Sequence, residues 1–339
     1  MNKKIKNELS QPLALDLQFE ESLNIEAITP LAPETSEENL STLPIELMFL
    51  TLPYKASDET IFIKSKIVED YKWTLRVEAL AVTYEEGKNN LPYGLPYGIY
   101  PRLLLYYICS EAKRSNSSEI TLGESFKEVL KNIKINDKDQ MKVDGKQIDI
   151  LAAQYFKLMT SRILLEKRFL GKDKIDFSGE FFNIIKGFKF EGDKNHIDFK
   201  IKLDTAFFDF IIKADSTVFS TDVIPHLKSS PMLLDLYVYF NYIAFSSNKF
   251  KVDQFISWKT LYEQFGTSHT LKGFKQNMKK NIEKLVLIHP SLSIKYGDNK
   301  NGEAGLFILK NSKPIIESRE YKKVNYHKKD KQNTKDKTK

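Results

Sequence analysis

The sequence predicts an α+β fold of two tandem winged-helix domains, each a helix-turn-helix followed by a β-hairpin wing, with disordered termini. Two observations predict it. The stretch from Phe255 to Leu309 shows two helical patterns separated by a short turn, and then two apolar runs separated by turn-forming residues. The same order of patterns occurs about 130 residues earlier in the chain. A repeated plan predicts two units of similar architecture.

The helix-turn-helix of the second unit begins with a short helix over residues 258–265. Gly266 ends this pattern, because glycine tolerates the left-handed backbone that often follows a helix. A longer helix is predicted over about residues 268–285, and a hairpin wing over residues 292–309. Spacings of three and four place the apolar residues of the longer helix on one buried face: Leu271, Phe274, Met278, Ile282 and Leu285.

The opposite face of this longer helix is basic. A tight turn followed by a helix with a basic outer face is the geometry of a recognition helix in the DNA major groove. An ordinary solvated lysine face is the alternative interpretation, and His269 fits either a DNA contact or a surface histidine without a role. The candidate DNA-binding residues are Ser268, His269, Lys272, Gln276, Lys279 and Lys280.

The first unit repeats the plan with a long polar loop, residues 136–146, between its last two helices. Its candidate DNA-binding residues are Gln154, Lys157, Ser161 and Arg162, which we expect on the outer face of the last helix and just after it. Alternation of β-branched and aromatic residues predicts the strands. The predicted elements are strands over residues 47–52, 60–67 and 72–82, helices over 99–115, 124–133 and 147–161, and strands over 163–169, 181–190 and 197–203.

Three side chains are the expected readers of DNA bases. Amide and guanidinium groups bond bidentately to adenine or guanine, which favours Gln154, Arg162 and Gln276 for this role. The lysines are expected to hold phosphates.

Charge is distributed unevenly along the chain. Residues 1–46 carry three lysines and nine acids, whereas residues 319–339 carry nine basic residues and three acids. The net charge of +7 favours a polyanionic partner, although an AT-rich genome would also produce a lysine bias. The predicted domains are a disordered acidic arm (1–46), two winged-helix domains (47–203 and 204–318) and a disordered basic tail (319–339).

Composition also limits the compartment and the chemistry. No apolar run is long enough for a membrane span or a signal peptide, so we expect a cytoplasmic protein without a membrane partner. Cys109, the single cysteine, lies in an apolar helix and is expected to be a buried thiol. The five histidines are too widely spaced for a nicking metal site, and no phosphate-binding glycine motif precedes a lysine. We therefore expect no catalytic residue, no metal and no cofactor.

Several motifs resemble those of the plasmid-encoded RepA-type replication initiator family. They are Gly94-Leu-Pro-Tyr-Gly-Ile-Tyr-Pro-Arg-Leu-Leu-Leu105, Ser229-Ser-Pro-Met-Leu-Leu-Asp-Leu-Tyr237, and Gln264-Phe265-Gly266 with Leu271-Lys-Gly-Phe274. The resemblance implies a protein that binds double-stranded repeats at a plasmid origin and promotes opening of the adjacent duplex. It also implies recruitment of the host replication initiator and replicative helicase, and a possible homodimer.

Two other classes of function fit the same folds. A transcriptional regulator or partition-type protein would bind DNA without loading a replisome, and a protein-interaction module would use the winged helices for protein contacts. Repeats of about 20 base pairs beside an AT-rich stretch near the gene would favour the initiator.

Overall fold

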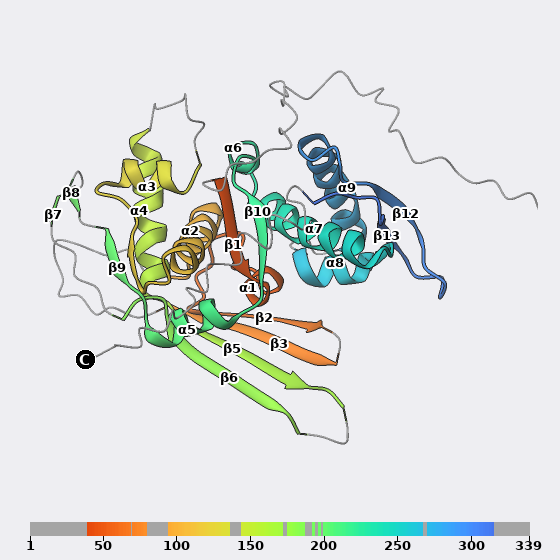
Figure 1. The fold of residues 1–339 in the computed structure, drawn as a ribbon, viewed down its shortest axis with the longest axis horizontal. Coiled ribbons are helices and arrows are strands. Elements are labelled where there is room, and N and C mark those ends of the chain that lie inside the picture. Colours follow the sequence, from red (N-terminus) through yellow and green to blue (C-terminus); the bar gives the residue numbers. More distant parts are fainter. Residues whose placement is uncertain are drawn as a thin grey trace, which may run out of the picture.

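The chain folds into a mixed α+β structure, seen here in a computed structural model (Figure 1). The residues it describes are 39–68, 70–79, 94–135, 144–171, 175–186, 192–193, 196–197, 199–266 and 270–314. Most of the predicted acidic arm, the whole basic tail and most of the predicted polar loop lie outside these residues. No helix within the described residues is long and apolar enough to cross a lipid bilayer.

The first unit is built on three helices and a four-stranded antiparallel sheet. The sheet has the order β2-β3-β5-β6, and its strands project from the body of the molecule (Figure 1). A second small sheet pairs β4 with β9. The elements are α2 (Ile99–Ser115), α3 (Phe126–Asn132) and α4 (Gly145–Thr160), with β2 (Ile61–Val68), β3 (Tyr71–Glu78), β4 (Glu119–Thr121), β5 (Arg162–Phe169), β6 (Phe177–Asn183), β7 (Gly192–Asp193), β8 (His196–Ile197) and β9 (Lys200–Lys202).

The second unit begins after a short connection and contains the other small sheet used below. Its strands follow the order β11-β13-β12, so the strand that precedes the helix-turn-helix pairs with the last strand of the hairpin. The elements are α5 (Thr205–Lys213), β10 (Ser216–Ser220), α6 (Ile224–Leu227), α7 (Pro231–Phe250), β11 (Gln254–Ser257), α8 (Trp258–Phe265), α9 (Leu271–Ile288), β12 (Ile294–Asp298) and β13 (Ala304–Ile308).

The ordered chain begins earlier than the sequence predicts. Residues 40–44 fall inside the predicted disordered arm, but they form β1 (Leu40–Pro44), which is buried and pairs antiparallel with β10. The prediction is wrong here because Ser and Thr suggest disorder only when they lack partners. The Thr42 backbone N–H donates to Ser110 Oγ at 2.8 Å, and Ser41 Oγ lies 2.7 Å from the same hydroxyl.

The predicted strand over residues 47–52 is also wrong, because residues 45–49 form the short helix α1 (Ile45–Phe49). A short apolar run does not distinguish a strand from a buried helix by periodicity. The position between the two units decides it. The Phe49 ring packs edge-on against Trp73 of the first unit and against Tyr239 and Tyr242 of α7.

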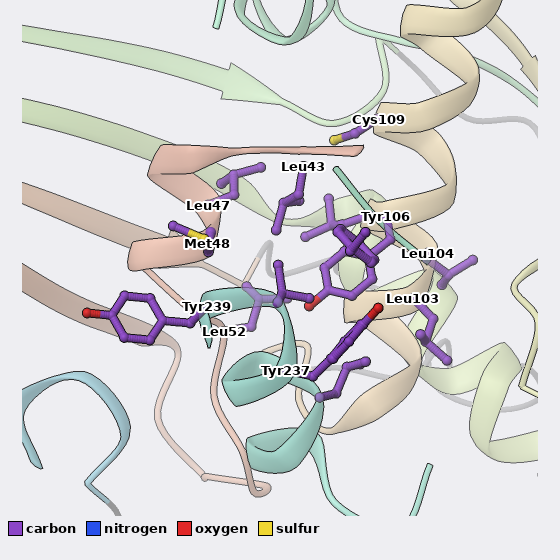
Figure 2. Packing of buried hydrophobic residues seen from close by; sticks show 14 of the residues in the cluster. Leu43, Leu47, Met48, Leu52, Leu103, Leu104, Tyr106, Cys109, Tyr237 and Tyr239 are labelled. Carbon is purple, nitrogen blue, oxygen red and sulfur yellow. The ribbon is translucent and has the colours of Figure 1, made fainter. Parts of the chain in front are cut away.

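One hydrophobic core runs through both units. Figure 2 shows Leu103, Leu104 and Tyr106 of α2 facing a cluster that includes Tyr237 of α7, with Leu43 and Leu47 beside them. The two opening helices of the units therefore lie against each other. The predicted division of the chain at residue 203 or 204 stays a prediction.

Candidate nucleic-acid interface

The most open basic helix face among the described residues belongs to α9. Thr270 caps the helix start, since its hydroxyl accepts a hydrogen bond from the Gly273 backbone N–H at 3.2 Å. The predicted apolar stripe is buried except at Leu271, which is 39% exposed. On the opposite side, the predicted residues Lys272, Gln276, Lys279 and Lys280 are exposed. Ser268 and His269 lie outside the described residues.

A hairpin lies next to α9, as the sequence predicts. β12 and β13 are antiparallel, and their connection turns at Gly302, whose φ of 75° suits a residue without a side chain. The side chain of Asn299 holds the tip, because its Oδ1 accepts from the backbone N–H groups of Asn301 and Glu303, both at 2.9 Å. The hairpin is thus a shaped element with an exposed tip.

An aromatic pair connects α8, α9 and the hairpin. The rings of Trp258 (α8) and Tyr296 (β12) stack with their planes at 16° and their centroids 5.8 Å apart. The Lys279 ammonium lies 5.1 Å from the centroid of Tyr296 and 6.0 Å from that of Trp258. Cation–π attraction fixes this lysine over the pair. Lys279 is therefore partly engaged within the protein, and Lys272 and Lys280 are the freer cations of the predicted set.

In the first unit, the structure corrects the expected position of two residues. Gln154 is 3% exposed, and its Oε1 accepts a hydrogen bond from the Tyr97 backbone N–H at 2.8 Å. Ser161 is fully buried and donates to the Lys157 backbone oxygen at 2.6 Å. Neither side chain lies on an outer face. The periodicity of α4 does not show that residues 95–98 pack on it from outside the helix.

The other two predicted residues of the first unit are more accessible. Lys157 is half-buried, with its ammonium 5.2 Å from the centroid of the Tyr97 ring, and burial lowers its pKa. Arg162 is exposed at the start of β5, where its guanidinium lies 4.8 Å from the centroid of the Phe181 ring. The four residues predicted for this unit therefore do not form one exposed surface.

The sequence analysis missed a buried ion pair between the units. Arg102 of α2 donates from Nε to both carboxylate oxygens of Asp235 of α7, at 2.9 and 3.0 Å. The same guanidinium donates to the backbone oxygens of Leu52, Pro53 and Gly98. Both residues lie inside motifs quoted above, at matching places in the two opening helices, which is the signal that could have found them.

Two lysines of β2 also reach the second unit. Lys64 donates to the backbone oxygen of Gln264 at 2.6 Å, at the end of α8. The Lys66 ammonium lies 4.4 Å from the ring centroid of Phe49 and 4.8 Å from that of Tyr239, and burial lowers its pKa to about 7. In return, Gln264 Nε2 donates to the Phe49 backbone oxygen at 2.6 Å. The first unit therefore holds α8 just before the turn that leads to α9.

Reactive groups were sought beyond this surface. Cys109 is fully buried, as expected, and burial raises the pKa of its thiol to about 12. Within the described residues, no group of three or more His, Cys, Asp or Glu side chains is arranged to hold a metal ion.

Comparisons with known proteins identify the family. The family described as "Plasmid encoded RepA protein" matches residues 95–260, from the connector before α2 to the start of α8. Two solved structures are similar to this chain: SeMet derivatives of domain 2 and domain 3 of RctB, and RctB domains 2-3. The first is 12% identical and covers 79% of this chain and 96% of its own, with a TM-score of 0.47. The second is 9% identical and covers 77% and 95%, also with a TM-score of 0.47. No curated protein matches the chain. Through residues 95–260 the chain belongs to the family of plasmid-encoded RepA proteins, as its motifs predicted.

Proposed function

We propose that this protein is a plasmid replication initiator that binds double-stranded DNA repeats at its origin sequence-specifically. Membership of the RepA family supports the role. The observation that carries DNA binding is the pairing of α8 and α9, with the exposed side chains of Lys272, Gln276 and Lys280 on the outer face of α9 and a hairpin beside it.

Each unit is proposed to be a winged helix. In the second unit the order α7, β11, α8, α9, β12, β13 and the pairing of β11 with β13 support this assignment. In the first unit α2, β4, α3 and α4 follow the same order, and β9 takes the place of β13 by pairing with β4. The four-stranded sheet is then an addition to the first unit.

The second unit is proposed to carry the reading of bases. α9 would lie in the major groove with Gln276 against an adenine edge, while Lys272 and Lys280 hold phosphates on either side. Lys279 would orient the hairpin through Tyr296 and contact a phosphate from there. In the first unit, Arg162 and Lys157 contribute phosphate contacts, whereas Gln154 and Ser161 are structural.

The wider role follows the family. We propose that binding at the repeats promotes opening of the adjacent duplex and brings in the host initiator and replicative helicase, without catalysis by this chain. A homodimer would repeat the interface on a second site. Each of these steps depends on the first one, the recognition of the repeats.

Charge reversal on α9 tests this recognition. In a Lys272→Glu/Lys280→Glu variant, affinity for the native origin duplex should fall by about a hundredfold or more. The slope of log affinity against log salt should become shallower by about 2, because two phosphate contacts are lost. Fluorescence anisotropy over roughly 50 to 200 mM salt measures both.

Lys55→Glu is the matched control, since Lys55 is exposed in the loop before β2 and far along the chain from α9. It makes the same charge change and should reduce origin binding by less than about threefold. If the α9 variant and the control bind the origin equally well, α9 is not the recognition helix and the proposal fails.

A further inference from the structure

The four-stranded sheet has a second face that is turned away from the core. Side chains alternate along a strand, so the buried Trp73, Leu75 and Val77 of β3 define the inner face. The cross-strand pairing then defines the other side, called here the outer face. It consists of Ile61, Ile63, Ser65 and Ile67 of β2, Lys72, Thr74, Arg76 and Glu78 of β3, Arg162, Leu164, Glu166 and Arg168 of β5, and Phe177, Gly179, Phe181 and Asn183 of β6.

Two aromatic rings stand on the outer face at the β6 edge. Phe177 is 60% exposed and Phe181 is 55% exposed, which is unusual for so large an apolar side chain. They are four residues apart on the same face, so about 13 Å separates them along the strand. Gly179 lies between them and leaves the gap open, with Leu164 and Glu166 beneath it. The arrangement is two ring surfaces with a space between.

Cations accompany both rings. The Arg162 guanidinium lies 4.8 Å from the Phe181 ring centroid, and Arg168 is the direct cross-strand partner of Phe177. Lys72 and Arg76 continue the basic character onto β3. The acids of the face are Glu78, which Arg76 bridges at 2.7 Å, and Glu166. Four cations and two carboxylates leave a net positive face.

From this arrangement we infer that the outer face binds single-stranded nucleic acid, with bases stacked on Phe177 and Phe181 and phosphates beside Arg162 and Arg168. Exposed rings on a four-stranded sheet, flanked by cations, are a general solution for holding unpaired bases. This site is separate from α9, and the inference does not depend on duplex reading. In an initiator, the strand exposed when a duplex opens would be the natural occupant.

A second copy of the chain is the competing occupant, because Ile63 and Ile67 are also exposed, at 60% and 64%. The charge pattern argues against it. The charged columns of β3 and β5 run between the isoleucines at one edge and the phenylalanines at the other. The centre of a stable protein interface is depleted of charge, whereas phosphates require cations at this position.

The test removes the two rings from the full chain. Binding of a fluorescein-labelled oligothymidylate of about 15 nucleotides, and of an abasic strand of equal length, is measured by anisotropy. The Phe177→Ala/Phe181→Ala variant should bind oligothymidylate at least about tenfold more weakly, with the abasic strand unchanged, because only base stacking is lost. Phe177→Leu/Phe181→Leu, which keeps apolar contact without aromatic stacking, should lose most of the same affinity.

Phe250→Ala is the matched control, since Phe250 is 62% exposed at the end of α7. It should leave oligothymidylate binding unchanged. The inference is overturned if the alanine pair binds oligothymidylate as well as the control does. It is also overturned if sedimentation shows a dimer that the alanine pair dissociates while oligothymidylate affinity stays the same. Origin-duplex binding separates this site from α9: the phenylalanine variants should retain it, and Lys272→Glu/Lys280→Glu should retain oligothymidylate binding.

Discussion

The outer faces of α4 and α9 differ although the sequence patterns of the two helices are alike. On α4, residues 95–98 cover the polar side, and Gln154 is used to accept a hydrogen bond from Tyr97. On α9, Gln276 and the lysines on either side of it stay exposed. Equal patterns thus give one covered helix and one open helix. The difference teaches that periodicity identifies the face of a helix that points away from its own core, but not whether another segment covers it.

The connector before α2 explains the difference. Gly94 and Gly98 adopt φ values of 108° and 80°, which glycine tolerates best, and this backbone brings Tyr97 onto α4. The carbonyl of Gly98 also accepts a hydrogen bond from Arg102. Before α7, by contrast, the chain forms α6, which packs on α7 itself. The covering of α4 therefore depends on a structure organised by Arg102.

Breaking the ion pair between the units should have the largest effect. Arg102→Met leaves the Asp235 carboxylate buried without its cation and three backbone carbonyls without their donor, so unfolding free energy should fall by about 3–5 kcal/mol. Urea denaturation measures it. The double variant Arg102→Met/Asp235→Leu should recover much of the loss, because no buried charge remains. Equal loss in the single and double variants would show that packing, not charge, explains the effect.

Much of the second unit could be predicted from sequence, because its determinants are local. The cap at Thr270, the buried stripe from Phe274 to Ile288 and the hairpin lie within 40 residues of one another. The open face of α9 follows from the same periodicity. Arg102 and Asp235 are 133 residues apart, and the contact of Gln264 with Phe49 spans 215 residues. No local pattern encodes such contacts, so the covering of α4 and the connection between the units needed the structure.

The second prediction concerns Lys66, which lies where the first unit contacts α7. Burial holds its folded pKa near 7, below the usual 10.5, so between these values the unfolded chain binds more protons. Stability should therefore rise with pH across this range. Lys66→Met removes the cost of burying the cation and should stabilise the protein by ~2 kcal/mol at pH 6.

This gain should shrink as the pH approaches 10, where the native lysine is neutral in the folded state. Urea denaturation at both pH values gives the comparison. Lys72→Met is the control, because Lys72 is exposed on the outer face of the same sheet. A stabilisation that does not depend on pH would contradict the assignment of the effect to the charge of Lys66.

A third prediction tests the covering of α4 directly. Gln154→Ala leaves the Tyr97 N–H without its acceptor, so we expect a loss of about 1–2 kcal/mol of stability. Affinity for the origin duplex should stay within about twofold, because Gln154 does not face DNA in this arrangement. Thermal denaturation and anisotropy on the same sample test both parts. Lost duplex affinity with unchanged stability would mean that the connector leaves α4 when DNA binds.

The smallest effect on stability is expected at the equivalent position of the open helix. Gln276→Ala removes an exposed side chain from α9, so the unfolding free energy should change by less than about 0.5 kcal/mol. Affinity for the native origin should nevertheless fall, by about 1–3 kcal/mol of binding free energy, while binding to a scrambled duplex stays constant. Gln154 and Gln276 would then show opposite responses: stability changes at the covered helix, and base discrimination changes at the open one. If Gln276→Ala weakens both duplexes equally, the amide holds the backbone rather than a base, and sequence reading by α9 must come from other side chains.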